Sequence, residues 1–191
     1  MKLKFMSLLL LSAFLVGCKS YRISEARVNE AMVQRIKEQP EQHIALSMGE
    51  QTLTLNMLIK AIEVDLLAAH GGVANIHVAT DMTGTLTMFG RQIALTTELI
   101  PNVQAGLEMK DGGIYLVEPK LLGLQVQGSS FNDQLLRSAL GPVQTDFEVA
   151  LAGYFAANPV YVLDHSALER SAALVVKQIS IEDDAIEVAL F

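Results

Sequence analysis

Few side chains in this sequence have the type and spacing that catalysis or metal binding requires. The four histidines are His43, His70, His77 and His165. They have no metal-ligand spacing among themselves. The acidic run 182–184 is more simply a charged hairpin turn than a cation site, because Ca²⁺ needs six or more oxygens around one loop. Ser129-Ser130 is typical of a helix start, and the known nucleophile, zinc and phosphate-loop motifs are absent from the sequence. We therefore expect no enzyme, no metal and no cofactor.

The residue with a definite chemistry is Cys18, the single cysteine of the chain. Residues 1–17 have the parts of an export signal: two lysines, an apolar run over 5–15, and the small pair Val16-Gly17. That run is shorter than the roughly 20 residues that span a bilayer. Leu15-Val16-Gly17-Cys18 resembles the lipobox of bacterial lipoproteins, in which the sulfur accepts a diacylglycerol. We expect cleavage before Cys18, a lipidated tether over 18–23 and one domain over 24–191. The alternative is an ordinary secretory signal followed by a chance cysteine.

Composition limits the partners of the mature chain. Removing residues 1–17 takes away two lysines and leaves 12 basic against 21 acidic residues, a net charge of −9. This charge argues against a nucleic-acid partner and against electrostatic docking onto anionic head groups. With no second cysteine there can be no internal disulfide, so the fold depends on its core.

The middle of the chain has the period-2 alternation of antiparallel strands with one buried face. It predicts long strands over 74–88, 93–109 and 114–127, with a hairpin turn at Asp111-Gly112-Gly113. In the second strand Leu95, Leu99 and Leu107 should be buried. On its opposite face Thr96, Glu98 and Glu108 should be exposed. The segment 52–69 is ambiguous: we interpret it as a strand with a phase change near 57–62, although Leu58, Ile62 and Leu66 also have helical spacing.

Helices are predicted on both sides of these strands. The first covers roughly 24–38, and a long amphipathic helix covers 130–157 with a kink at Gly141-Pro142. The capping box Ser166-Ala167-Leu168-Glu169 opens a third helix to about 177, and residues 179–190 form a closing hairpin. The expected fold class is α+β.

The dry strand face is aliphatic and rich in methionine. Met82, Met88 and Met109 lie on it, and tryptophan is absent from the chain. Such a face can close as a solid core or leave a tunnel whose flexible lining accepts acyl chains. Composition favours the solid core, since apolar sheet faces usually pack against another layer.

Several stretches resemble the YceB-like lipoproteins of Gram-negative bacteria, a family defined by a domain of unknown function. They are Tyr21-Arg22-Ile23-Ser24, the turn 111–116, the block 150–163 (ALAGYFAANPVYVL) and the end 177–191 (KQISIEDDAIEVALF). The resemblance implies a tubular lipid-binding fold (BPI-like or TULIP-like), in which a long curved antiparallel sheet wraps a long helix. It carries no catalytic residues. The residue after the lipid cysteine is Lys19 rather than aspartate, which by the same kind of resemblance favours the outer membrane, facing the periplasm.

The resemblance also implies a groove between sheet and long helix that binds a lipid or other apolar ligand. Its expected lining is Met82, Leu86, Met88, Leu95, Leu99, Leu140, Phe147 and Leu151. Two rival readings remain open. One is a scaffolding envelope lipoprotein with a solid core that acts through protein contacts, and the other is a periplasmic enzyme whose site has no recognisable motif.

Overall fold

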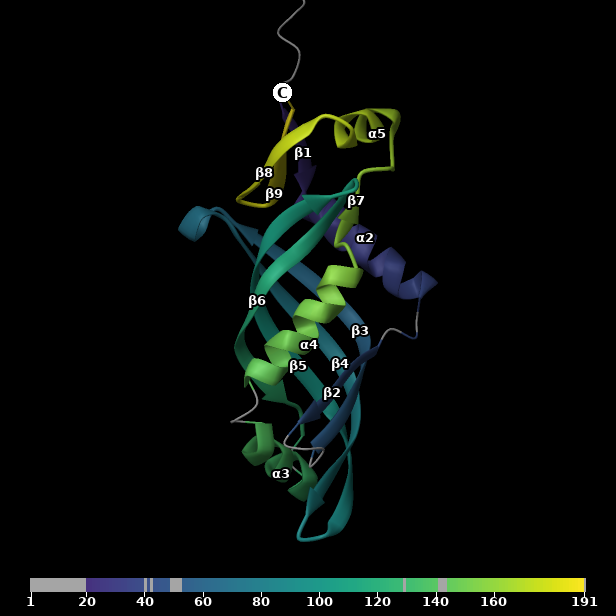
Figure 1. Ribbon diagram of the computed structural model, residues 1–191, viewed down its shortest axis with the longest axis vertical. Helices are drawn as coiled ribbons and strands as arrows, with labels where there is room; N and C mark the ends of the chain where they lie inside the picture. Colours follow the sequence, from purple (N-terminus) through teal and green to yellow (C-terminus); the bar gives the residue numbers. More distant parts are fainter. Residues whose placement is uncertain are drawn as a thin grey trace, which may run out of the picture.

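The computed structural model describes residues 20–39, 41, 43–48, 53–128, 130–140 and 144–190. More than half of them lie in strands, arranged in two antiparallel sheets (Figure 1). The larger sheet has the order β2-β3-β4-β5-β6-β7, and the smaller has the order β1-β9-β8. The larger sheet comprises β2 (His43–Met48), β3 (Leu53–Leu67), β4 (Val73–Met88), β5 (Arg91–Lys110), β6 (Gly113–Val126) and β7 (Tyr161–Val162). The smaller comprises β1 (Ser20–Ser24), β8 (Val176–Glu182) and β9 (Ala185–Leu190).

The three long central strands agree with the alternation in the sequence. β4, β5 and β6 lie where strands were predicted, and Asp111-Gly112 turns the chain between the last two with both residues at positive φ. The predicted register of β5 is confirmed: Leu95 and Leu99 are buried, whereas Thr96, Glu98 and Glu108 are exposed. Leu107 is half-buried.

The ambiguous segment 52–69 forms strand β3, and its predicted phase change is confirmed. The register with β4 shifts between Ile59 and Ala61, which is a β-bulge. Before the bulge the odd positions up to Ile59 are buried, and after it the even positions Ile62, Val64 and Leu66 are buried. The helix-like spacing of four between Ile62 and Leu66 is also a multiple of the strand period of two, so it suited both structures.

The expected sheet wrapped around a long helix is wrong, and so is the α+β class. The region 130–157 contains two shorter helices, and strands dominate the described residues. Residues 141–143 lie outside the described part. Pro142 lacks an N–H and its ring clashes with the preceding turn, which ends a helix as readily as it kinks one. The apolar spacing stays in phase across Gly141-Pro142, so periodicity alone predicted one helix where the structure has two. The helices are α2 (Glu25–Glu38), α3 (Phe131–Leu140), α4 (Gln144–Ala157), α5 (Ala167–Ala173) and the 3₁₀ turn η1 (Ala69–Gly71).

Helix α4 packs on one face of the larger sheet against β6 and β2 (Figure 1). It buries Phe147, Leu151 and Phe155, which are spaced four residues apart and so share one helix face. Of the helices in the described residues, none is long and apolar enough to cross a membrane.

Helix α2 covers an edge that the sheet leaves open. Strand β2 pairs with β3 only as far as Leu58, so within the described residues the rest of β3 has no strand on that side. The Asn29 side chain takes the place of a neighbouring strand. Its Nδ2 donates to the Val64 carbonyl at 2.9 Å, and its Oδ1 accepts from the Val64 N–H at 2.8 Å. Glu25 accepts from the Leu66 N–H at 2.8 Å. These bonds satisfy backbone groups that an uncovered edge would expose.

The small sheet ties the two ends of the described chain together. Residues 20–23, which we assigned to the tether, lie in β1 and pair with β9. The closing hairpin is confirmed as β8 and β9, but α5 ends at Ala173 rather than near residue 177. Ser166 caps α5 by accepting from the Glu169 N–H at 3.1 Å.

Candidate functional site

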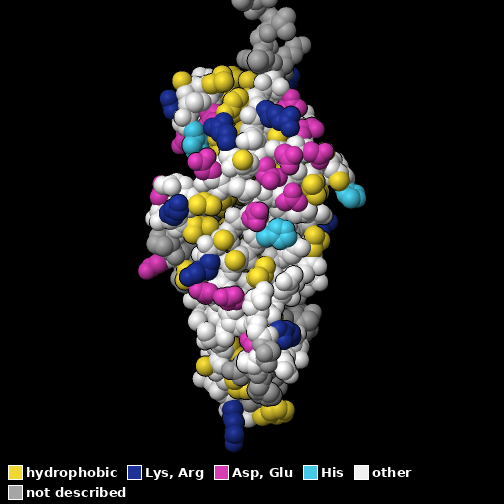
Figure 2. All heavy atoms as spheres, turned by 180° about the vertical axis from the view of Figure 1, so that it is seen from behind, with side chains coloured by type: hydrophobic (Ala, Val, Ile, Leu, Met, Phe, Trp, Pro, Cys, Tyr) yellow, Lys and Arg dark blue, Asp and Glu magenta, His cyan; other side chains and the backbone are white. Residues whose placement is uncertain are grey.

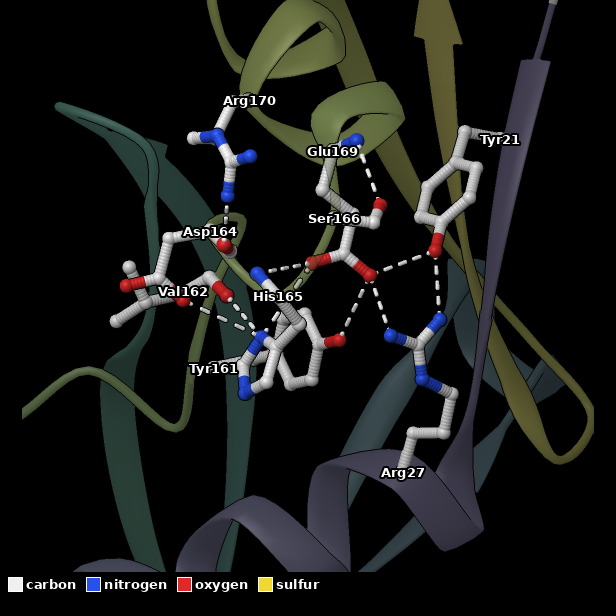
Figure 3. A network of polar contacts seen from close by, with 9 residues as sticks. All are labelled: Tyr21, Arg27, Tyr161, Val162, Asp164, His165, Ser166, Glu169 and Arg170. Carbon is white, nitrogen blue, oxygen red and sulfur yellow. Dashed lines mark hydrogen bonds and ion pairs between the residues drawn. The ribbon is translucent and has the colours of Figure 1, made fainter.

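A buried carboxylate, Glu169 of α5, is the centre of a polar network that joins four elements (Figure 3). Its side chain is fully buried. It accepts hydrogen bonds from the Tyr21 hydroxyl of β1 at 2.7 Å and from the Tyr161 hydroxyl of β7 at 3.1 Å. Arg27 of α2 forms an ion pair with it, and the His165 N–H donates at 2.9 Å. The carboxylate therefore has the several donors that a buried charge requires.

Aromatic and cationic contacts complete the network. Arg27 also donates to the Tyr21 hydroxyl at 2.6 Å, and its guanidinium carbon lies 5.7 Å from the centre of the Tyr161 ring. The Tyr161 and His165 rings stack with their centres 5.0 Å apart. Each residue thus contacts at least two others, which fixes the position of α5 against β1, α2 and β7.

The electrostatics of the network favour an ionised Glu169. Burial raises the pKa of this carboxyl, but the hydrogen bonds from Tyr21, Arg27, His165 and Tyr161 together lower it further, so the pKa lies below its ordinary value. Burial and the neighbouring Glu169 charge raise the pKa of Tyr161. The carboxylate is enclosed and has Tyr21, Arg27, Tyr161 and His165 as its partners. The network holds α5 in position.

The outer end of α5 forms one wall of an open cleft. The cleft has a volume of about 730 Å³, within the roughly 300–1,000 Å³ usual for ligand sites. The β5–β6 hairpin forms the facing wall, where Gly112 lies so close that a Cβ built on it would be 3.6 Å from the Ala173 Cβ. The apolar lining is Leu107, Met109, Ala173, Leu174, Val176 and Ile179, and the polar lining includes Glu108, Asp111, Lys177 and Gln178. The lining of the cleft is therefore mixed, with apolar and polar side chains on its walls.

The residues predicted to line a groove have a different location. Met82, Leu86, Leu95, Leu99, Phe147 and Leu151 belong to one hydrophobic core and are at most 5% exposed. The side chains of Met88 and Leu140 lie outside the described part, and so does Cys18. The structure brings the six described residues together, as a shared interior requires, and their role toward a ligand stays a prediction.

The sequence interpretation missed both the network and the cleft. Glu169 was recognised only as the end of a capping box, and Tyr21 and Tyr161 only as parts of a family resemblance. Residues 174–177 were assigned to a helix, which hid the wall that Leu174 and Val176 form. The available signal was the apolar run 172–176, which has no polar interruption and so does not suit a solvent-exposed helix end. Within the residues described here, no group of His, Cys, Asp and Glu could hold a metal ion.

A family model described as "Protein of unknown function (DUF1439)" matches residues 23–185. This chain belongs to the DUF1439 family. The DUF1439 match runs from the end of β1 to the start of β9, so it includes the larger sheet, the cleft and the residues of the network other than Tyr21. The expectation of a family of unknown function is confirmed, and the narrower likeness to YceB-like lipoproteins stays a prediction.

More distant comparisons add little to the DUF1439 match. A crystal structure of lipopolysaccharide binding protein has 14% sequence identity and a TM-score of 0.33, over 90% of this chain. This chain spans 40% of the length of that protein. A likeness this distant is no argument about a ligand. A search of curated proteins finds no match.

Proposed function

We propose that this DUF1439 chain is a lipoprotein of the outer membrane, facing the periplasm, that binds an acyl chain or a similar apolar ligand in the cleft between α5 and the β5–β6 hairpin. The observation that carries the proposal is the cleft itself. Six of its lining residues are apolar, and they come from β5, β8 and α5 with the turn after it. The flexible methionine side chain, here Met109, adapts to varied apolar partners, which suits a flexible ligand chain.

The buried network supports this assignment by making one wall rigid. Glu169 holds α5 from the inside, while Ala173 and Leu174 at the end of the same helix contact the cleft. A preformed wall lowers the conformational entropy that binding would cost. The polar residues at the rim, Lys177 above all, could pair with the head of an amphiphile.

A second candidate is the scaffolding role with a solid core. The observation that favours it is the tight burial of the predicted groove residues, since Met82 and Leu99 are inaccessible to solvent. The two candidates differ in whether the purified chain takes up an apolar ligand.

Cys18→Ser should leave an uncleaved, unacylated precursor, because the sulfur is the acceptor of the first lipid. Intact mass and membrane fractionation measure the effect. Ser20→Ala, two residues further along the chain, is the control and should be processed as the wild type is. If the Cys18 variant is cleaved and fractionates with membranes like the wild type, the lipoprotein assignment is wrong.

Met109→Trp should fill the cleft and weaken uptake of a fluorescent long-chain fatty acid at least about tenfold, a loss of about 1.4 kcal/mol of binding free energy. The side chain of Met109 is half-buried at the cleft, so a larger one has space to occupy and folding should change little. Titration of the probe against the purified full-length chain gives the affinity.

Leu122→Trp is the matched control, because it adds the same ring on β6 at an exposed position outside the cleft lining. It should bind the probe as the wild type does. Failure of the wild type to take up the probe would leave the scaffolding role. Equal loss in both variants would place the ligand elsewhere.

A further inference from the structure

The small sheet brings the start of the described chain close to the cleft. Ser20 of β1 pairs with Ala189 of β9, which pairs in turn with Gln178 of β8. Adjacent strands lie about 4.8 Å apart, so Ser20 and Gln178 are separated by roughly 10 Å. Gln178 lines the cleft. Cys18 precedes Ser20 by two residues, which reach at most about 7 Å. A lipid on Cys18 would therefore start beside the cleft.

The same end of the molecule exposes apolar side chains. Leu174 is 86% exposed, Leu168 60% and Val175 39%, and all three lie on α5 or in the turn directly after it. Figure 1 shows α5 and the small sheet together at one end of the long axis. Scattered exposed leucines are normal on a protein surface. These three are grouped on one short element that the Glu169 network holds in place.

Charge within the small sheet is arranged along the strands. The acidic turn Asp183-Asp184 joins β8 to β9. It lies at the level of Ser24, the end of β1 that is far from Ser20. Four residues of extended chain, about 13 Å, separate that turn from the level of Ser20. At that level β8 presents Val176, Lys177 and Gln178, without an acidic residue. The β8 edge nearest Ser20 thus carries one lysine and no carboxylate, whereas Glu108 and Asp111 belong to the β5–β6 wall of the cleft.

We propose that the α5 end is a membrane-contact surface, formed by Leu168, Leu174 and Val175, which rests on the membrane that holds the Cys18 lipid and opens the cleft toward that membrane. The inference deepens the proposed function and rests on it for the anchor. Aliphatic side chains that enter the interfacial region strengthen membrane binding in addition to the lipid. A ligand could then pass between bilayer and cleft without crossing water.

The opposite end of the long axis is the natural alternative contact. Phe89, in the turn between β4 and β5, is 98% exposed. It has a φ of +51°, a conformation that disfavours a bulky side chain. The sixteen residues of β4 place it about 50 Å from the end of the sheet near the cleft. On the face drawn in Figure 2, acidic side chains lie mainly over the half that carries the small sheet. An experiment on orientation must therefore compare both ends.

The chain has no tryptophan, so a tryptophan introduced at one end reports by its fluorescence on that end alone. We would introduce one tryptophan as Leu174→Trp or as Phe89→Trp, and reconstitute each lipidated mature chain into vesicles that contain brominated phospholipid. The ring at 174 should lose emission and shift to the blue, whereas the ring at 89 should keep the emission it has in vesicles without bromine. Quenching at 89 equal to or greater than that at 174, or no quenching at 174, would overturn the proposal.

A second variant separates this surface from the cleft. Leu168→Asp combined with Val175→Asp changes two exposed residues that lie outside the cleft lining. Uptake of a fluorescent fatty acid from vesicles should slow several-fold, while its affinity measured without vesicles should stay unchanged. Unchanged uptake from vesicles would contradict the membrane contact. Loss of binding without vesicles in the wild type would instead contradict the proposed ligand cleft, and the tryptophan result would still decide the orientation.

Discussion

Leu99→Asp should unfold most of the domain. Leu99 is inaccessible to solvent in the middle of β5, where it pairs with Thr80 of β4 and Val126 of β6. A carboxylate there would be buried among core side chains, and a buried charge without a partner costs roughly 3–5 kcal/mol, added to the lost burial of the leucine. Domains of this size are stable by only about 5–15 kcal/mol. Urea unfolding followed by circular dichroism measures the loss.

Glu98→Lys is the matched control, one residue away on the opposite face of the strand. Glu98 is exposed, so reversing its charge should change the free energy of unfolding by no more than about 0.5 kcal/mol. A stable Leu99→Asp variant together with an unstable Glu98→Lys variant would mean that the register of β5 is reversed.

Glu169→Ala should have the second largest effect, a loss of about 3–5 kcal/mol of folding free energy. The substitution removes the acceptor of the Tyr21 and Tyr161 hydroxyls and the partner of Arg27. The Tyr161 hydroxyl would be left buried without its partner, which itself costs about 1–3 kcal/mol. Glu30→Ala, an exposed carboxylate on α2, is the control and should cost little. Equal effects of the two variants would show that the network does not stabilise the fold.

The same carboxylate makes stability depend on pH in a defined direction. Its pKa in the folded chain lies below the ordinary value of about 4.5, so its contribution is complete above that pH and is lost as the pH falls toward the folded pKa. The wild type should therefore lose stability from about pH 5 downward. Glu169→Gln cannot ionise, so its unfolding free energy should fall less steeply over this range. Parallel pH profiles would contradict the assignment.

The alternation of buried and exposed residues along the strands could be predicted, because it depends on residues that are neighbours in sequence. Alternation placed β4, β5 and β6, and even the bulge at Ile59 appeared as a phase change in β3. The helices around Pro142 could not be predicted in the same way. The spacing of apolar residues indicates which side of a helix is buried. It does not indicate whether the residues form one helix or two, such as α3 and α4.

The candidate site was hidden for another reason. Its parts come from segments far apart in the sequence, such as Met109 and Leu174, and each part has a common local interpretation. A glutamate three residues after a serine reads as a capping residue, and Glu169 does sit in that position. Only the tertiary structure shows that its carboxylate also accepts from Tyr21, which is 148 residues away.

The pairing of β1 with β9 has a consequence for how the molecule is made. Ser20 pairs with Ala189, so the small sheet cannot form until almost the whole chain is available. Pairings over such long separations are slow to form, because the entropy of closing the loop is lost before any contact is gained. Strands β2 to β6 of the larger sheet pair in chain order and can assemble earlier. The N-terminal strand is therefore among the last parts to become ordered, and loss of the last few residues would release it without disturbing the hairpins already formed.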